Sequence, residues 1–82
     1  MKIGQIVYSK AGRDKGKLLA VISSDESGVF VVDGKERPLE RPKLKKPKHL
    51  TLTGDCLKTE EYRSNKALRS ALKRYKSKKD EL

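Results

Sequence analysis

The amino-acid sequence predicts a mainly β fold: a small closed barrel of four or five short strands, followed by one amphipathic, basic α-helix. Three features support this fold class. Apolar runs of strand length recur in the first two-thirds of the chain, turn-forming segments separate them, and the apolar spacing becomes helical towards the C-terminal end. Because the chain has only 82 residues, we expect at most one domain with a small core.

Three strands are predicted in the first part of the chain. Residues 3–9 contain the β-rich stretch Ile6, Val7 and Tyr8 and form the first. Residues 18–22 are a continuous apolar run, which is typical of a buried strand. Residues 29–32 have high β propensity at every position and predict the third strand.

The segments beside these strands favour turns. Residues 10–17 hold two glycines and four basic residues around one aspartate, and residues 23–27 are polar and end at Gly28. Asp33 and Gly34 then form a dipeptide that is typical of a hairpin turn. We therefore expect the chain to reverse direction at Asp33-Gly34, just before residues 35–37.

The next segment is basic and rich in proline. Residues 41–48 carry five positive charges, and prolines at 38, 42 and 47 argue against a central strand or a helix there. We expect an extended segment that tracks a phosphate groove, that serves as a flexible linker, or that does both. Residues 49–53 alternate in polarity and predict a last short strand, ended by Gly54 and Asp55.

A helix is expected after this strand. Thr59 and the acidic residues that follow it favour a helix start, and an apolar stripe follows at helical spacing. The stripe predicts a packing surface, either on the barrel or on a partner. The chain is thus divided into a barrel, residues 1–56, and a basic helical extension, residues 57–82. The stripe residues are Leu68, Ala71, Leu72 and Tyr75.

Positive charge is concentrated in the second half of the chain. The formal net charge is +10, of which residues 1–40 contribute +1 and residues 41–82 contribute +9. Phosphates attract such a surface and release counterions when they bind it, so nucleic acid is the expected partner. The alternative, that the charge only maintains solubility, does not account for its uneven distribution.

Few residues offer catalytic or metal-binding chemistry. The chain has one histidine, His49, and one cysteine, Cys56; a third group to orient such a pair is not evident. We expect His49 to face solvent or RNA and Cys56 to pack at the base of the helix. No phosphate-binding loop, dinucleotide fingerprint or metal cluster is present in the sequence. We therefore expect no enzymatic activity, no cofactor, no bound metal and no small-molecule substrate.

No segment has the length and apolar character of a signal peptide or a membrane span, so the expected location is cytoplasmic, with no membrane partner.

Residues 4–22, GQIVYSKAGRDKGKLLAVI, resemble a KOW motif. In that family a strand leads into a basic, glycine-containing loop and then into a second apolar strand, within an SH3-like barrel. KOW modules occur in ribosomal proteins and transcription elongation factors. The resemblance therefore implies an SH3-like barrel that binds RNA or protein.

The order of later segments is similar to one ribosomal family. The chain resembles the archaeal and eukaryotic large-subunit proteins called L-fourteen in the order of residues 16–22, 31–34, 37 and 49–53. Those proteins place a basic helical extension after the barrel. The chain also resembles their short bacterial relatives. Many bacterial KOW ribosomal proteins have a glycine where this chain has Leu19, so the loop follows the L-fourteen variant.

The leading hypothesis is therefore an RNA-binding protein that associates with rRNA of the large ribosomal subunit, with ribosomal proteins as further partners. The alternative is a protein-interaction module that binds a transcription or translation factor. A DNA-binding protein is a third hypothesis, which rests on charge alone. The candidate RNA-binding residues are Lys10, Gly12, Arg13, Lys15, Gly16, Lys17, Arg37, Arg41, Lys43, Lys45, Lys46, Lys48, Arg69, Lys73 and Lys76.

Overall fold

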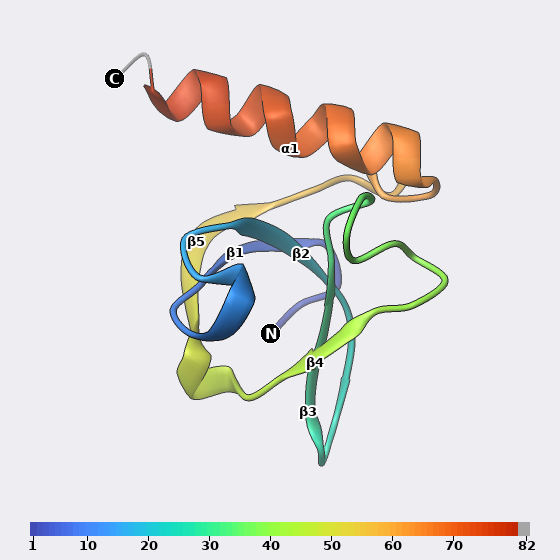
Figure 1. Cartoon of the computed structure of the whole chain (residues 1–82). Helices are drawn as coiled ribbons and strands as arrows, with labels where there is room; N and C mark the ends of the chain where they lie inside the picture. The colour runs from blue at the N-terminus through green and yellow to red at the C-terminus, as the bar shows by residue number, and fades with distance from the viewer. Residues whose placement is uncertain (81–82) are drawn as a thin grey trace.

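The computed structural model describes residues 1–80; residues 81 and 82 of the predicted extension lie outside it. Five antiparallel strands form one sheet in the order β4-β3-β2-β1-β5, and helix α1 follows them (Figure 1). This arrangement confirms the predicted fold class, mainly β and barrel-like with a C-terminal helix, although β4 and β5 do not pair to close the barrel among the described residues. The strands and the helix are β1 (Gln5–Ser9), β2 (Leu18–Asp25), β3 (Gly28–Val32), β4 (Lys43–Lys45), β5 (Leu50–Cys56) and α1 (Asn65–Asp80), and the 3₁₀ turns are η1 (Gly12–Asp14), η2 (Pro47–His49) and η3 (Thr59–Glu61).

The three central strands bury side chains on both faces. Successive side chains of a strand point to opposite faces, so Val7 enters the interior of the barrel while its neighbour Ile6 packs beneath α1. Two-sided burial explains why these strands read as continuous apolar runs rather than as alternating ones. The interior cluster is Val7, Leu19, Val21, Val29, Val31 and Leu50, and the cluster beneath the helix is Ile6, Ala20, Val32, Leu57, Leu68, Ala71 and Leu72.

The β2–β3 hairpin is tighter than the polar segment 23–27 predicts. Strand β2 continues to Asp25, because Ser23 and Ser24 pair with Phe30 and Val29 of β3. The Asp25 carboxylate accepts a hydrogen bond of 2.7 Å from the backbone N–H of Ser27. Exposed serines can continue a strand where its partner is long enough to pair with them.

The chain turns at Asp33 as predicted, but no strand follows directly. The Asp33 carboxylate accepts 2.8 Å hydrogen bonds from the backbone N–H groups of Lys35 and Arg37, which stabilises a loop. The next strand, β4, begins only at Lys43. It lies at the edge of the sheet, beside β3.

The basic segment 41–48 is therefore not a free linker. Its middle pairs with β3, and its end forms the 3₁₀ turn η2. Pro42 and Pro47 flank β4 without interrupting it, as prolines can at an edge strand. The flexible-linker interpretation of residues 41–48 is wrong for residues 43–45, which form β4, and for residues 47 and 48, which begin η2.

Strand β5 and helix α1 differ from their predicted limits. Strand β5 continues through Gly54 and Asp55 to Cys56 and carries an irregularity in its pairing with β1. The helix start predicted at Thr59 is wrong, because residues 59–61 form a 3₁₀ turn and α1 begins at Asn65. The Ser64 hydroxyl caps α1 by accepting a hydrogen bond of 3.1 Å from the backbone N–H of Ala67.

Helix α1 lies along one side of the barrel, over the sheet (Figure 1). The predicted stripe is confirmed as packing surface: Leu68, Ala71 and Leu72 are buried against the sheet, and Tyr75 packs beside them. The helix thus contributes to the second hydrophobic cluster, on the outer face of the sheet. Across the described residues, no helix is both long and apolar enough to cross a membrane.

Candidate nucleic-acid interface

One buried carboxylate connects three segments of the chain. Asp14, in the β1–β2 loop, is 1% exposed, and its Oδ2 atom accepts hydrogen bonds from Nη2 and Nε of Arg37 at 3.2 and 3.3 Å. The ammonium of Lys45, on β4, lies 3.4 Å from the same oxygen. A single acid therefore joins the β1–β2 loop, the 33–42 loop and the edge strand β4.

The environment of Asp14 favours its charged form. Burial alone would raise the pKa of this carboxyl, but the hydrogen bond and charge of Arg37, assisted by Lys45, lower the pKa below its ordinary value. The second carboxylate oxygen, Oδ1, is buried and has no hydrogen-bond partner in the described part of the chain. The two cations thus hold Asp14 ionised in a position that water hardly reaches.

Further hydrogen bonds hold the β1–β2 loop against the basic segment. The ammonium of Lys45 donates to the carbonyl oxygen of Ala11 at 3.2 Å. The backbone N–H of Lys10 donates to the carbonyl oxygen of His49 at 2.7 Å. The two basic segments predicted to contact RNA, residues 10–17 and 41–48, are therefore neighbours in the folded protein.

Several cations of these two segments point into solvent. None of them forms an ion pair within residues 1–79, so they present charge from a backbone that the Asp14 contacts hold in place. We call this set the basic surface. Its members are Lys10, Arg13, Lys15, Arg41, Lys43, Lys46 and Lys48, all exposed.

Other predicted RNA-binding residues take part in internal contacts. Lys45 is 9% exposed and is committed to Asp14 and Ala11, and Arg37 is committed to Asp14. Lys17 lies 2.9 Å from Glu36; this pairing raises the pKa of the lysine and lowers that of the glutamate. Lys45 and Arg37 therefore hold neighbouring segments together through Asp14, and Lys17 is paired with Glu36.

Arg69, on α1, also makes an internal contact. Its guanidinium donates a 2.7 Å hydrogen bond to the carbonyl oxygen of Gly34. Lys73 and Lys76 follow Arg69 at helical spacing on the same flank of α1, and both are exposed. The structure thus connects this flank with the 33–42 loop, which in turn contacts Asp14. Gly12 and Gly16 are exposed in the β1–β2 loop.

Sequence reasoning assigned no role to Asp14. The available signal was a lone acid inside a basic, glycine-containing loop, a pattern that fits an internal counter-charge. Its partners could not be read from the sequence, because 23 positions separate Asp14 from Arg37.

His49 and Cys56 do not form a catalytic pair. His49 immediately precedes β5 and Cys56 ends it, so the two lie on the order of 20 Å apart at about 3.3 Å per residue. Cys56 is exposed, so the prediction that it packs at the base of the helix is wrong. Among the described residues, no group of three or more metal-ligating side chains converges.

Comparison with known proteins gives no family for this chain. A scan against protein-family models finds no match, and a search of curated proteins finds no significant relative.

Proposed function

We propose that this chain is an RNA-binding protein that contacts structured RNA through the basic surface. The observation that carries the proposal is the Asp14 carboxylate, which brings the β1–β2 loop and β4 together through Arg37 and Lys45. Cations on a preorganised backbone lose less conformational freedom on binding than cations on a mobile tail. Such a surface suits a rigid array of phosphates.

The chemistry of the surface favours contact with the RNA backbone. Lysine and arginine position a protein on phosphates but carry little sequence information. The two segments that carry the basic surface, residues 10–17 and 41–48, contain no aromatic residue, and recognition of unpaired bases depends largely on stacking against aromatic rings. We therefore propose a folded, duplex-containing RNA as the ligand.

The resemblance of residues 4–22 to a KOW motif extends this proposal to rRNA of the large ribosomal subunit, in the cytoplasm. The exposed flank of α1, with Lys73 and Lys76, adds a second group of cations for such an RNA.

Salt dependence of binding tests the RNA proposal. A variant in which Lys43, Lys46 and Lys48 are alanine removes three cations from the basic surface. Each lost phosphate contact lowers the slope of log affinity against log salt by about 0.7–0.9, so we expect a decrease of about 2. The measurement is fluorescence anisotropy with a labelled RNA hairpin at several salt concentrations.

The matched control replaces Lys2, Lys58 and Arg63, which are exposed and lie outside the basic surface. It makes the same change in net charge, and we expect the slope to stay close to that of the wild type. Equal slopes for both triple variants would show that net charge alone attracts the RNA, and the proposal would be rejected.

Sedimentation tests the ribosomal part. The tagged protein is run on gradients of cell extract at low and high salt, with the Lys43, Lys46 and Lys48 variant beside it. We expect the wild type to travel with large subunits and the variant to be released at lower salt. Wild-type protein that stays at the top of the gradient at low salt contradicts the ribosomal assignment.

A further inference from the structure

Strand β5 presents an open edge. It is the last strand of the sheet and pairs with β1 on one side; no strand of the described chain pairs with its other side. Strand β4, at the opposite edge, carries two lysines and lies between two prolines, features that protect an edge from further pairing. Strand β5 has one charged residue, Asp55, and no proline; its pairing with β1 is irregular between Gln5 and Val7, and the Thr53 hydroxyl accepts a hydrogen bond of 3.2 Å from the backbone N–H of Asp55. In charge and in proline, its outer edge is the less protected of the two.

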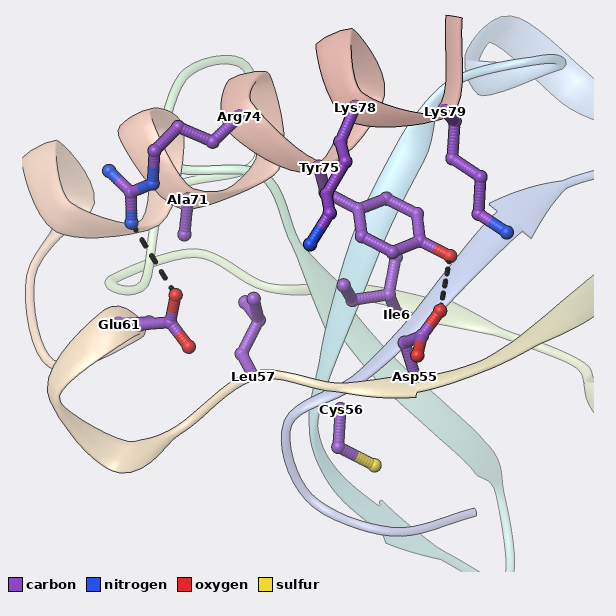
Figure 2. A pocket seen from close by; sticks show the side chains of 10 residues that line it. All are labelled: Ile6, Asp55, Cys56, Leu57, Glu61, Ala71, Arg74, Tyr75, Lys78 and Lys79. Carbon is purple, nitrogen blue, oxygen red and sulfur yellow. Dashed lines mark hydrogen bonds and ion pairs between the residues drawn. The ribbon is translucent and has the colours of Figure 1, made fainter. Parts of the chain in front are cut away.

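A hollow lies beside this edge, between α1 and the end of β5 (Figure 2). Its volume is about 560 Å³. Ile6, Leu57 and Ala71 give it an apolar floor, and Figure 2 shows Asp55 and Leu57 directed towards the helix while Cys56 points away from it. A strand added to the outer edge of β5 would direct alternate side chains into this hollow, because side chains of a strand alternate between two faces.

The rim of the hollow carries three cations and two acids, and both acids already have partners. Asp55 accepts a 2.7 Å hydrogen bond from the Tyr75 hydroxyl, and Glu61 lies 3.4 Å from the guanidinium of Arg74. Lys78 and Lys79 also line the hollow, and neither forms an ion pair in the part of the chain that the structure describes. The ammonium of Lys79 lies 5.6 Å from the centre of the Tyr75 ring. An incoming acidic group would find these two lysines available.

We propose that β5 and this hollow form a docking site for an extended acidic peptide segment of another protein. The segment adds to β5 as a strand, places apolar side chains over Ile6, Leu57 and Ala71, and pairs its carboxylates with Lys78 and Lys79. Backbone hydrogen bonds supply affinity in this mode of recognition, and the pockets beside the strand supply specificity.

Two features distinguish a peptide from RNA as the occupant. The open edge of a strand offers N–H and C=O groups at the repeat of another peptide backbone, which a nucleic acid does not match. The floor of the hollow is apolar, and Leu52 of β5 exposes a further apolar side chain that is 52% accessible. Because the hollow lies on the flank of α1 opposite Lys73 and Lys76, peptide and RNA can occupy the protein together.

The test uses a defined probe, a short labelled peptide that alternates glutamate with valine. Binding is followed by fluorescence anisotropy and by amide shifts of the ¹⁵N-labelled full chain. We expect the largest shifts at residues 50–57 and around Tyr75. Replacing Lys78 and Lys79 with glutamate should weaken binding at least about tenfold, since two attractive contacts become repulsive. The matched control places glutamate at Lys73 and Lys76, on the other flank, and should bind nearly as the wild type does.

Two methylated peptides test the strand-addition geometry. Each carries N-methyl groups on alternate backbone nitrogens, in complementary sets. Only the nitrogens that face β5 donate to it, so one peptide should lose binding and the other should retain it.

Three results would overturn the proposal: no binding of the parent peptide, equal loss in both lysine variants, or retained binding of both methylated peptides. Amide shifts confined to residues 10–17 and 41–48 would also overturn it, because the peptide would then be acting as a polyanion on the basic surface. The RNA titration of the preceding section is unaffected by these results, so the two proposals can fail separately.

Discussion

The Oδ2 atom of Asp14 lies 3.2 Å from Nη2 of Arg37, although 23 positions separate the two residues in the chain. The carboxylate is almost fully buried, while the guanidinium side chain is 24% exposed. This contact helps to fix the conformation of the β1–β2 loop, because the loop has little apolar side-chain surface of its own to bury. Together with Lys45 and with backbone hydrogen bonds such as that from Lys10 to His49, it holds the basic surface in place.

Replacing Asp14 with asparagine should destabilise the fold. The substitution keeps the shape of the side chain but leaves Arg37 and Lys45 without their counter-charge. Breaking a buried pair costs about 3–5 kcal/mol, and we expect about 3 kcal/mol here because Arg37 reaches solvent. Urea unfolding measures the change. The control is Glu26→Gln, at an exposed acid in the β2–β3 turn. Its unfolding free energy should stay within about 0.5 kcal/mol of the wild-type value. A similarly small change for Asp14→Asn would contradict the stabilising role of the Asp14–Arg37 pair.

Acidification should remove the contribution of ionised Asp14 to the free energy of unfolding. The folded pKa of Asp14 lies below the ordinary value of 3.8, so its contribution to stability is complete above that pH and is lost as the pH falls through the lowered pKa. The difference in unfolding free energy between the wild type and Asp14→Asn should therefore be largest near neutral pH and shrink below about pH 4. Urea titrations at a series of pH values measure it. A difference that stays constant down to pH 2 would show that Asp14 does not titrate with a lowered pKa.

Local chemistry was sufficient to predict most of the strands. The continuous apolar run at 18–22 predicted a buried strand, and the β propensity of residues 29–32 predicted another strand. Both prove to be strands buried on two sides, by the barrel interior and by α1. The helical stripe from Leu68 to Tyr75 indicated a packing face, and the sheet is what it packs against. In each case the side chains themselves carry the information, through their spacing.

Features that depend on distant partners could not be predicted. Strand β4 forms because Lys43 to Lys45 pair with Val29 to Val31, and nothing within residues 41–48 indicates that pairing. The helix start was misplaced for a local reason: the Glu61 carboxylate accepts a hydrogen bond from the backbone N–H of Lys58 at 2.8 Å, which closes a separate turn. Among the candidate site residues, exposed and paired lysines look identical in sequence, so Lys45 could not be told from Lys43.

Gly34→Ala should destabilise the fold where the 33–42 loop meets the start of α1. Gly34 has a φ of +81°, and an added Cβ would lie 2.5 Å from the carbonyl oxygen of Asn65, in the first turn of α1. The substitution therefore combines backbone strain with a clash against a helix backbone, and we expect a loss of at least about 2 kcal/mol. Gly16→Ala is the control: its φ is +86°, but nothing lies within 4 Å of the added Cβ. It should cost only about 1 kcal/mol. Equal losses in thermal unfolding would mean that the contact with Asn65 adds nothing.

Leu68→Ala tests whether α1 belongs to the core. Leu68 is fully buried between the helix and the sheet, and deleting a buried leucine side chain typically costs about 2–5 kcal/mol. Unfolding should remain a single transition, followed equally by a helix signal and by tyrosine fluorescence, because helix and sheet share this cluster. Leu52→Ala, at an exposed leucine, should change stability by less than about 0.5 kcal/mol. A Leu68→Ala protein that loses its helix signal while the barrel stays intact would indicate an independent extension.

Substitution of Lys43 should weaken RNA binding, whereas substitution of Lys45 should lower the stability of the fold. Both lie on β4, two positions apart, yet Lys43 is exposed and Lys45 contacts Asp14 and the carbonyl oxygen of Ala11. On the proposed RNA-binding function, Lys43→Ala weakens RNA binding and lowers the salt slope by about 0.7–0.9, with almost unchanged stability. Lys45→Ala lowers the unfolding free energy by about 1–3 kcal/mol, because it leaves buried acceptors with fewer donors. At a temperature where both variants are fully folded, Lys45→Ala should keep the wild-type salt slope. A reduced slope in that folded variant would place the Lys45 ammonium on the RNA rather than on Asp14.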